Sequence, residues 1–470
     1  MAISSPGLAS GIDIKGIVSQ LVALERAPLS QLQTQANGFQ ARLSVFGTIT
    51  SMVSALGDAS ARLAGANTFT QVKGSSSQPE SVTVSVADST APTSLALDVV
   101  SLAQAQSTAS AAVPVDSGMG AGTLTITLGD WSSGSFAPGT GTPMTINVVE
   151  GKDKLTDIAA QINAAKGGVT ATVLRDASGE RLLMRSKDTG EALGFQVAAA
   201  DGDANDGKDL GRLAFTSLTG SPMSLTQAGM NAVAKVNGVT IESASNTVKE
   251  ALPGITLNLL KPTTSAATIS VSNDKDSMRK AVQGFVDAYN SLADMLATST
   301  KYDADTKTRG SLQGDATAVG LQRALRSMIR SETPGGAFTR LSDVGIEIKA
   351  DGKMSINSTK LDAALDQPAE MTRLFGAEND NPTLKGFGFK LDAFADGMVA
   401  SDGTLSARTS SLRSAIQRNS REMDKVTERA TRAEARYLAQ YNAMDASVAR
   451  LNSLNAYVAQ QITLWNKSSG

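Results

Sequence analysis

The C-terminal part of this chain carries the pattern that constrains its fold most strongly. Over residues 405–465, apolar side chains recur at alternating three- and four-residue steps, at Leu405, Leu412, Ile416, Met423, Val426, Ala430, Ala433, Tyr437, Met444, Leu451, Leu454, Val458 and Trp465. No Pro interrupts this stretch, and it contains no Gly. A heptad pattern kept over about eight heptads predicts one long helix with a left-handed supercoiling tendency. At 1.5 Å per residue, that helix is a rod of roughly 90 Å.

Such a helix needs a partner, because leaving its stripe in water would cost on the order of 20 kcal/mol at roughly 1.5 kcal/mol per side chain. The N-terminal part supplies a second apolar stripe, at Ile14, Ile17, Leu21, Leu24, Leu29, Leu32, Ala36, Phe39, Leu43, Phe46 and Val53. Pro28 interrupts it, and we expect the helix to break or kink there. The two ends are predicted to pair with each other or with copies of themselves.

Five polar residues occupy positions of the C-terminal stripe, namely Thr409, Asn419, Gln440, Ser447 and Gln461. Polar residues at core positions lower stability but fix register and partner number. A helical hairpin with no assembly role would produce the same stripes, although their length exceeds that of an average globular helix. The N-terminal stripe is the shorter one, so part of the C-terminal stripe must find its partner elsewhere.

Between the two ends, the apolar period changes to two, which is typical of half-buried antiparallel strands. Strands are predicted near residues 82–86, 95–99, 124–128, 146–149, 169–173, 233–239, 255–259 and 269–271. Asn237-Gly238 and residues 176–179 have the composition of hairpin turns. Helices are predicted at 155–165, 277–296 and 321–329, and a Gly/Asp-rich stretch at 383–403 precedes the terminal rod.

The order of elements indicates an α+β multidomain chain with a nested insertion layout. At 470 residues it exceeds the size of a single core. We expect a coiled-coil leg domain of residues 1–45 and 425–470 and a helical domain of 46–77 and 274–424. Two antiparallel β-rich domains would lie inside these, an inner one of 78–112 and 228–273 and an outer α+β one of 113–227.

Two absent residue types argue against catalysis. The chain has no Cys and no His, which removes thiolate chemistry, the commonest general base and the commonest transition-metal ligands. We expect no enzyme activity, no metal and no cofactor.

Charge and hydropathy restrict the possible partners. The 43 basic and 45 acidic residues nearly cancel, so no nucleic-acid partner is expected. No stretch has the 18–20 apolar residues of a membrane span, and the first residues lack the pattern of a Sec signal peptide. We expect no membrane insertion, and either a cytosolic location or export by another route.

Three local motifs have a simple structural explanation. Residues 201–209 resemble a calcium or phosphate loop, but Arg212 stands where a calcium ligand belongs and Asp209 where Ser or Thr should follow Lys208, so a solvated turn is favoured. The arginines of residues 408–436 alternate with acidic residues, as on a soluble helix surface. Trp131 with Phe136 is expected in a small core rather than as an exposed glycan contact.

A further set of short segments is distinctive as a group, namely residues 7–14, 17–18, 20–21, 25–26, 28–29, 245–248, 252–257, 285–290, 312–315, 344–346 and 351–354. Together they resemble the flagellar hook-associated protein 2 family, which forms the flagellar filament cap. Residues 145–147, 159–163, 168–169 and Leu183 resemble the insertion motif shared by flagellins and hook proteins. Residues 113–140 and 198–227 match least, as expected of a variable outer domain.

The resemblance implies a structural protein exported unfolded by the flagellar type III route to the distal tip of the flagellum outside the cell. There a homo-oligomeric ring retains exported flagellin and promotes its folding and insertion. Its expected partners are itself, flagellin, hook–filament junction proteins, a cytoplasmic export chaperone and, in an adhesin role, host mucin or glycan. The expected contact stripe for other copies or flagellin comprises Ile14, Ile17, Leu21, Leu24, Leu29, Leu32, Phe39, Met423, Val426, Tyr437, Met444, Leu451, Leu454, Val458 and Trp465.

Three other functions remain open at this stage. A flagellin-like subunit would share the terminal helices but polymerise without limit. An adhesin would use residues 113–227 to bind glycan, which is compatible with a cap. A wall hydrolase would need a site made of carboxylates alone, for which no motif is present.

Overall fold

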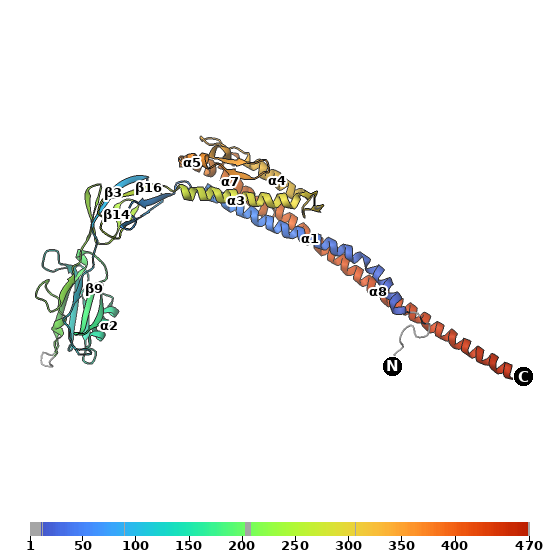
Figure 1. Cartoon of the computed structure of the whole chain (residues 1–470), viewed down its shortest axis with the longest axis horizontal. Helices are drawn as coiled ribbons and strands as arrows, with labels where there is room; N and C mark the ends of the chain where they lie inside the picture. Colours follow the sequence, from blue (N-terminus) through green and yellow to red (C-terminus); the bar gives the residue numbers. More distant parts are fainter. Residues whose placement is uncertain (1–10, 12, 89, 203–207, 306, 469–470) are drawn as a thin grey trace. The chain divides into compact units, whose positions relative to one another are not determined.

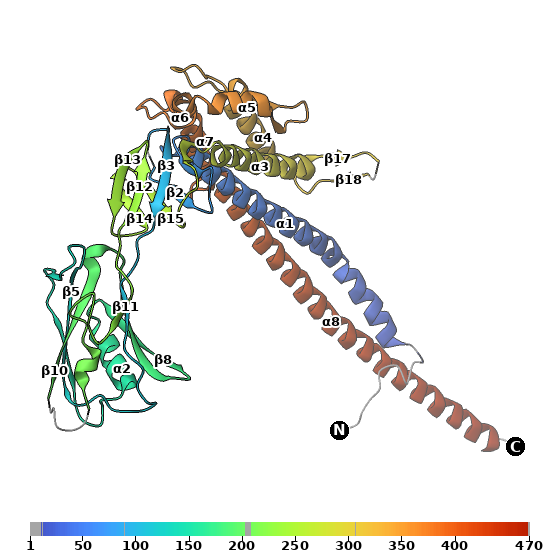
Figure 2. The same ribbon diagram turned by 60° about the vertical axis from the view of Figure 1, so that its left-hand side comes forward.

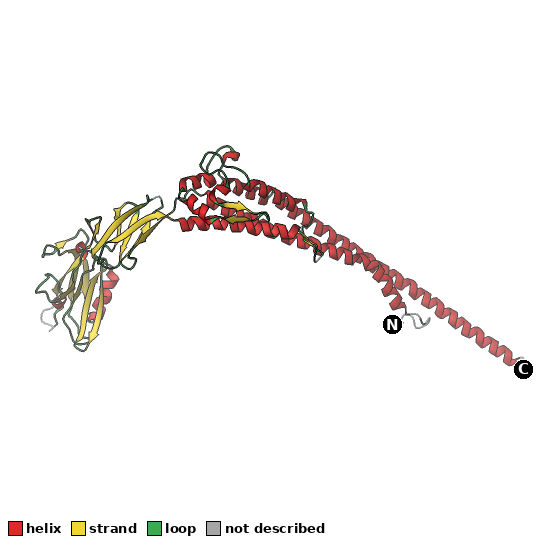
Figure 3. Cartoon of the chain, turned by 45° about the horizontal axis from the view of Figure 1, so that its top comes forward, coloured by secondary structure: helices red, strands yellow, loops and turns green. Residues whose placement is uncertain are grey.

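The computed structural model describes residue 11 and residues 13–88, 90–202, 208–305 and 307–468. The chain divides into two compact units, unit 1 of Met1–Phe69 with Asp276–Gly470 and unit 2 of Thr70–Lys275. Unit 2 is therefore inserted into unit 1, which confirms the predicted α+β multidomain class and its nesting. Figure 3 shows that unit 1 is mostly helical and unit 2 mostly made of strands. The finer division into four domains stays a prediction.

Unit 1 is built around two long helices, α1 (Ile14–Ala64) and α8 (Thr404–Ser468), which lie side by side (Figure 1). Its shorter helices are α3 (Lys275–Thr300), α4 (Ala316–Ile329), α5 (Ser358–Leu365), α6 (Pro368–Gly376) and α7 (Phe387–Val399), with short 3-10 turns η3 (Leu341–Val344) and η4 (Pro382–Leu384). Two small hairpins complete it, β17 (Tyr302–Asp303) with β18 (Thr308–Arg309), and β19 (Ile346–Ile348) with β20 (Met354–Ile356).

The core of unit 1 joins the second half of α1 to the shorter helices. Phe46, Ile49 and Val53 of α1 are buried in one cluster with Phe285 of α3 and Phe387 of α7. Asparagine and aspartate side chains start several of these helices by accepting hydrogen bonds from free backbone amides. Asp13 caps α1 and Asp315 caps α4 in this way.

Unit 2 contains four antiparallel sheets. The first has the order β1 (Val72–Ser76), β16 (Ala267–Asn273), β3 (Thr93–Ser101), β12 (Ala232–Val236), β13 (Val239–Ser243), and the second β14 (Thr247–Leu252), β15 (Ile255–Leu259), β2 (Val82–Val86). The third has the order β10 (Gly194–Asp201), β5 (Gly122–Asp130), β6 (Ala137–Pro138), with β7 (Met144–Val148) also paired to β5. The fourth has the order β11 (Ser224–Gln227), β4 (Ser107–Ala109), β9 (Gly179–Ser186), β8 (Val169–Asp176).

The strands of unit 2 surround two separate apolar clusters. One is formed by β2, β3, β12, β15 and β16, and the other by the third and fourth sheets with α2 (Leu155–Ala165) and the short turn η2 (Leu210–Leu213). A second short turn, η1 (Glu191–Leu193), contributes no buried residue. The Asn237-Gly238 hairpin is confirmed between β12 and β13. Both of its residues have positive φ, +48° and +84°, as this two-residue turn requires.

Two features of unit 1 differ from the sequence-based predictions. α1 runs unbroken through Pro28, so the predicted break is wrong. Residues on both sides of the proline pack against α8, and this packing offsets the lost hydrogen bond. The Gly/Asp-rich stretch before the terminal rod contains helix α7, which was not predicted.

Candidate assembly interface

The α1–α8 pair is antiparallel, as three contacts along it show. The Arg408 guanidinium of α8 lies 5.9 Å from the centre of the Phe46 ring of α1. Farther along α8, Asn419 donates a hydrogen bond to Gln35 at 3.3 Å, and Arg429 is 3.2 Å from the Glu25 carboxylate. Residue numbers along α8 therefore increase as those along α1 decrease. The predicted pairing of the two chain ends is present within a single chain.

The buried face at the start of α1 is shifted from the predicted stripe. Ile14, Val18 and Val22 form a buried cluster with Ala430 of α8, whereas Leu24 is 72% exposed. Ile17 and Leu21 are half-buried beside the cluster.

The shift follows from helical phase. The half-buried line continues from Val22 to Glu25 and then to Leu29 and Leu32, in alternating three- and four-residue steps. Glu25 thus occupies the place on the face towards α8 that was predicted for its apolar neighbour Leu24. The charge of Glu25 is paired with Arg429. Leu24 is left on an outer line with Ile17 and Leu21, which flanks the α8 contact. Ile17 and Leu21 are half-buried on this line, and Leu24 is exposed.

The middle of both stripes lies between the paired helices. Met423, Val426 and Tyr437 of α8 are half-buried, as are Leu29, Leu32 and Phe39 of α1. Tyr437 packs against the Ile14 cluster together with Leu438 and Tyr441. The contact with α1 therefore ends near Tyr441, where the described part of α1 begins.

Beyond Tyr441, α8 continues with its stripe open to solvent, and Figure 2 shows this end passing the start of α1. Leu451 is 62% exposed and Trp465 is 75% exposed, and Met444, Leu454 and Val458 are exposed as well. Three further apolar side chains that the predicted stripe does not include are exposed on this end: Tyr457, Ile462 and Leu464. They lie outside the three–four spacing, and they widen the apolar surface beyond a single seam.

Charge changes along α8 at the point where the contact with α1 ends. Up to Arg436 the surface is dense in charge and carries ion pairs such as Arg26–Glu434 at 3.6 Å and Arg432–Glu428 at 2.7 Å. After Tyr437 the sequence contains only Asp445, Arg450 and Lys467 as charged residues. A charge-poor helix end with so many exposed apolar side chains is typical of a surface that another protein covers.

One buried polar residue interrupts the paired stripe. Asn419 is buried and uses its amide group to donate to Gln35, while its Oδ1 atom has no hydrogen-bond partner among the described residues. An unsatisfied buried acceptor costs about 1–3 kcal/mol, and its usual benefit is a fixed register. Beyond Tyr437, the polar residues of the stripe are exposed, namely Gln440, Ser447 and Gln461.

The described residues contain no cluster of three or more acidic side chains placed to hold a metal ion. The Lys208 ammonium, 2.7 Å from Asp153, holds the pKa of that buried carboxyl below its ordinary value. Lys208 of the loop-like motif is thus engaged in an ion pair, while residues 203–207 of that motif lie outside the described residues. Within the described chain, no helix combines the length and apolar character needed to cross a membrane.

Trp131 belongs to an aromatic cluster in unit 2. Its indole nitrogen donates to the Phe195 carbonyl at 3.0 Å. Its ring lies 4.9 Å from Phe136 and 5.3 Å from Phe215, centre to centre. The side chain is half-buried and packs against a core, which favours the structural explanation over a glycan contact.

Comparison with known families gives matches along most of the chain. The model of the flagellar hook-associated protein 2 N-terminus matches residues 10–106, and that of its C-terminus matches residues 229–453. Between them, residues 123–188 match the flagellin hook IN motif, which confirms the insertion motif seen in the sequence. The residues 7–14 that suggested the family lie mostly outside the described part of the chain.

Individual relatives agree with these matches. The chain is 30% identical to flagellar hook-associated protein 2 of Escherichia coli K12 over 98% of both chains. It is 29% identical to the A-type flagellar hook-associated protein 2 of Pseudomonas aeruginosa over 97% of this chain and 96% of that one. Among solved structures, the D1-D2-D3 domains of the flagellar cap protein from Escherichia coli align with a TM-score of 0.61 at 28% identity, covering 78% of this chain and 99% of that one.

Proposed function

Since this chain belongs to the flagellar hook-associated protein 2 family, the filament cap proteins of the flagellum, we propose that several copies form a closed ring at the distal tip of the filament. The ring retains newly exported flagellin outside the cell and promotes its folding and insertion. The observation that carries this proposal is the exposed apolar end of α8, which extends past the start of α1.

In this mechanism the leg, defined as α1 up to Leu43 together with α8 beyond Met423, has two parts. In the half next to the core, the apolar surface is covered by the α1–α8 contact within one chain. The other half presents Leu451, Leu454, Val458 and Trp465 to a neighbouring copy or to flagellin. The outer line of Ile17, Leu21 and Leu24 on α1 is a second surface of the same kind. Binding uses burial of apolar area and needs no cofactor.

The remaining partners follow from the same surface. Before export, an exposed apolar helix end of this kind would promote nonspecific association in the cytoplasm. An export chaperone that covers it would prevent this association. Hook–filament junction proteins are expected beneath the ring before the first flagellin arrives. The proposed adhesin role rests on the resemblance alone, since Trp131 packs into a core.

Removing residues 442–470 tests the proposal. This truncation keeps the whole α1–α8 contact, so the free energy of unfolding should stay within about 0.5 kcal/mol of the full chain. We expect a strain that carries only the truncated chain to release flagellin into the medium as monomer and to grow no filaments. Filaments of normal length would contradict the proposal.

A matched pair of variants separates the apolar surface from helix length. The first replaces Leu451 and Leu454 with Gln and Val458 with Thr, and we expect it to stop filament growth. The control replaces Ser453, Gln460 and Thr463 with Ala on the opposite side of the helix and should leave growth unchanged. Equal defects in both variants would indicate a nonspecific effect on the helix.

An open filament is the second candidate assembly, because the paired helices alone also suit a flagellin-like subunit. Light scattering on the purified chain distinguishes the two. A ring gives one maximum mass that does not change with concentration, whereas an open polymer grows with concentration.

A further inference from the structure

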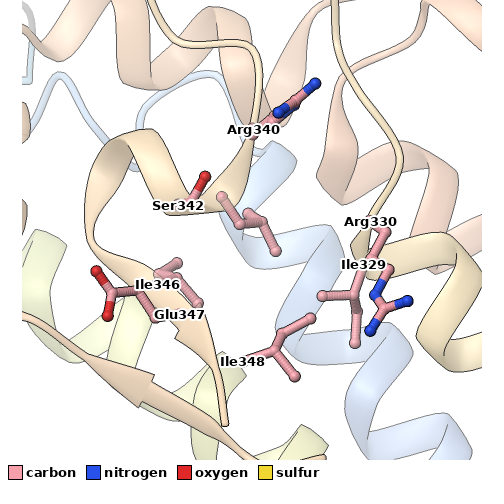
Figure 4. A pocket seen from close by; sticks show the side chains of 8 residues that line it. Ile329, Arg330, Arg340, Ser342, Ile346, Glu347 and Ile348 are labelled. Atoms are coloured by element: carbon pink, nitrogen blue, oxygen red, sulfur yellow. The ribbon is translucent and has the colours of Figure 1, made fainter. Parts of the chain in front are cut away.

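Unit 1 contains a pocket that the leg does not use. It has a volume of about 490 Å³ and lies between the end of α4 and the segment from η3 to β19 (Figure 4). Ile329, Ile346 and Ile348 contribute apolar side chains to its wall, and Ser342 stands at its edge. The space is large enough for one or two side chains of another protein.

Uncompensated positive charge borders this pocket. Two of its charged side chains are neutralised locally, Arg340 by Glu332 and Glu347 by Lys360 at 2.9 Å. Arg330 has no acidic partner among the described residues.

The same is true of two more arginines on α4. Arg326 precedes Arg330 by four residues and Arg323 precedes Arg326 by three, so the three lie on one face of α4. All three are exposed, and none forms an ion pair with a described residue. Arg326 and Arg330 also oppose the rise that burial produces in the pKa of Tyr289, which places their charge beside the core.

Unit 1 also carries a surface that would complement this pocket, with an exposed apolar side chain and acidic residues. It is the loop of residues 377–386 between α6 and α7. Leu384 is 39% exposed there. Glu378 and Asp380 are exposed and form no ion pair within the described chain, while Lys385 is half-buried at the base of the loop. Asn379 and Asn381 fix its shape by accepting hydrogen bonds from the Asn381 and Thr383 amides, so little order must be gained on binding.

Building on the ring proposed above, we propose that the 377–386 loop of one copy docks into the α4–β19 pocket of the next copy. Leu384 enters the apolar pocket, and Glu378 and Asp380 face Arg330 and Arg326. Because the two surfaces are different, the contact is head-to-tail and repeats from copy to copy until the ring closes. Exposed ion pairs are individually weak, so this contact sets the orientation between neighbours, and the legs add affinity.

Charge reversal in the full-length chain tests this contact. One variant carries Arg326→Glu and Arg330→Glu, a second carries Glu378→Arg and Asp380→Arg, and a third carries all four changes. Analytical ultracentrifugation gives the concentration at which each chain is half assembled. We expect this concentration to rise at least tenfold in the first two variants and to return to within about threefold of the original in the third.

The apolar part of the contact has its own test. Leu384→Asp removes the side chain that enters the pocket, and Ser342→Trp fills the pocket from its edge. Both positions are exposed, so folding should be retained, which circular dichroism checks. We expect each change to raise the half-assembly concentration at least tenfold, and Arg185→Glu, at an exposed site on β9, to leave it unchanged.

Several outcomes would overturn the contact while leaving the cap function intact. Unchanged assembly in both two-site variants, or no recovery in the four-site variant, excludes docking between these surfaces. Loss of flagellin binding at normal self-assembly would assign the pocket to flagellin instead. A full-length chain that stays monomeric, with or without flagellin, would overturn the ring itself.

Discussion

Asp315 is buried at the start of α4, where it accepts hydrogen bonds from the Thr317 and Ala318 amides. Arg408 of α8 reaches the same carboxylate at 2.6 Å and also covers the Phe46 ring of α1. One ion pair thus connects α4, α8 and α1. Buried pairs of this kind contribute more to orientation than to net stability, since both charges lose their water. Asp315 and Arg408 therefore orient the three helices relative to one another.

Asp392 on α7 permits a prediction about pH. Burial raises the pKa of this carboxyl, and the nearby charges of Asp396 and Asp58 raise it further. The folded state therefore binds the proton more tightly than the unfolded state does, so the ionised carboxylate lowers stability at neutral pH. Its unfavourable effect disappears as the pH falls through the folded-state pKa. We expect Asp392→Asn to raise the free energy of unfolding by roughly 0.5 kcal/mol at pH 7, because solvent screens part of the effect.

Thermal unfolding at several pH values checks this prediction. The gain from Asp392→Asn should shrink as the pH falls through the folded-state pKa, because the original carboxyl then takes up its proton. Asp402→Asn, at an exposed position before α8, is the matched control and should show no gain. A gain that persisted unchanged below that pKa would attribute the effect to packing rather than to charge.

At the scale of elements, segments with a regular apolar period were predictable, and segments without one were not. Helix α2 has the predicted bounds of Leu155–Ala165, because its apolar face and its limits are all local. Helices α5 to α7 were missed, since eight to thirteen residues with several glycines give little periodic signal. On α1, Leu24 is exposed and Glu25 is half-buried against α8, a difference that depends on helical phase and not on apolar character. The pocket beside α4 could not be predicted, as its walls come from segments that only the fold brings together.

Pro28 shows how packing overrides local preference within α1. The proline has no amide hydrogen, so the Leu24 carbonyl receives no helical hydrogen bond there. Pro28→Ala should restore this bond at an exposed position and raise the free energy of unfolding of unit 1 by about 1–3 kcal/mol. Hydrogen exchange should slow for the amides of residues 18–30, which measures the gain locally. A loss of stability would mean that Pro28 sets a bend needed for packing on α8.

At the scale of the whole molecule, the insertion of unit 2 has a simple geometric basis. Its first and last strands, β1 and β16, pair with each other, with Val72 opposite Asn273. The Asp274 amide then donates to the Gln71 carbonyl at 2.8 Å. The chain therefore enters and leaves unit 2 at neighbouring points, roughly 5 Å apart as in any antiparallel pair. Domains with adjacent ends can be inserted without disturbing their host.

This geometry predicts that the two units fold independently. Replacing residues 70–275 with a short Gly/Ser linker should leave unit 1 folded, because its apolar core is formed by its own helices, and residues 70–275 alone should also fold. Calorimetry of the full chain should show two transitions, and each separate unit should reproduce one of them within about 3 °C. A single transition in the full chain, with either part unfolded on its own, would show that the units stabilise each other. If both units fold, the linked unit 1 retains the leg together with the α4–β19 pocket and the 377–386 loop. Its ability to assemble then measures directly how much of the proposed ring depends on unit 1 alone.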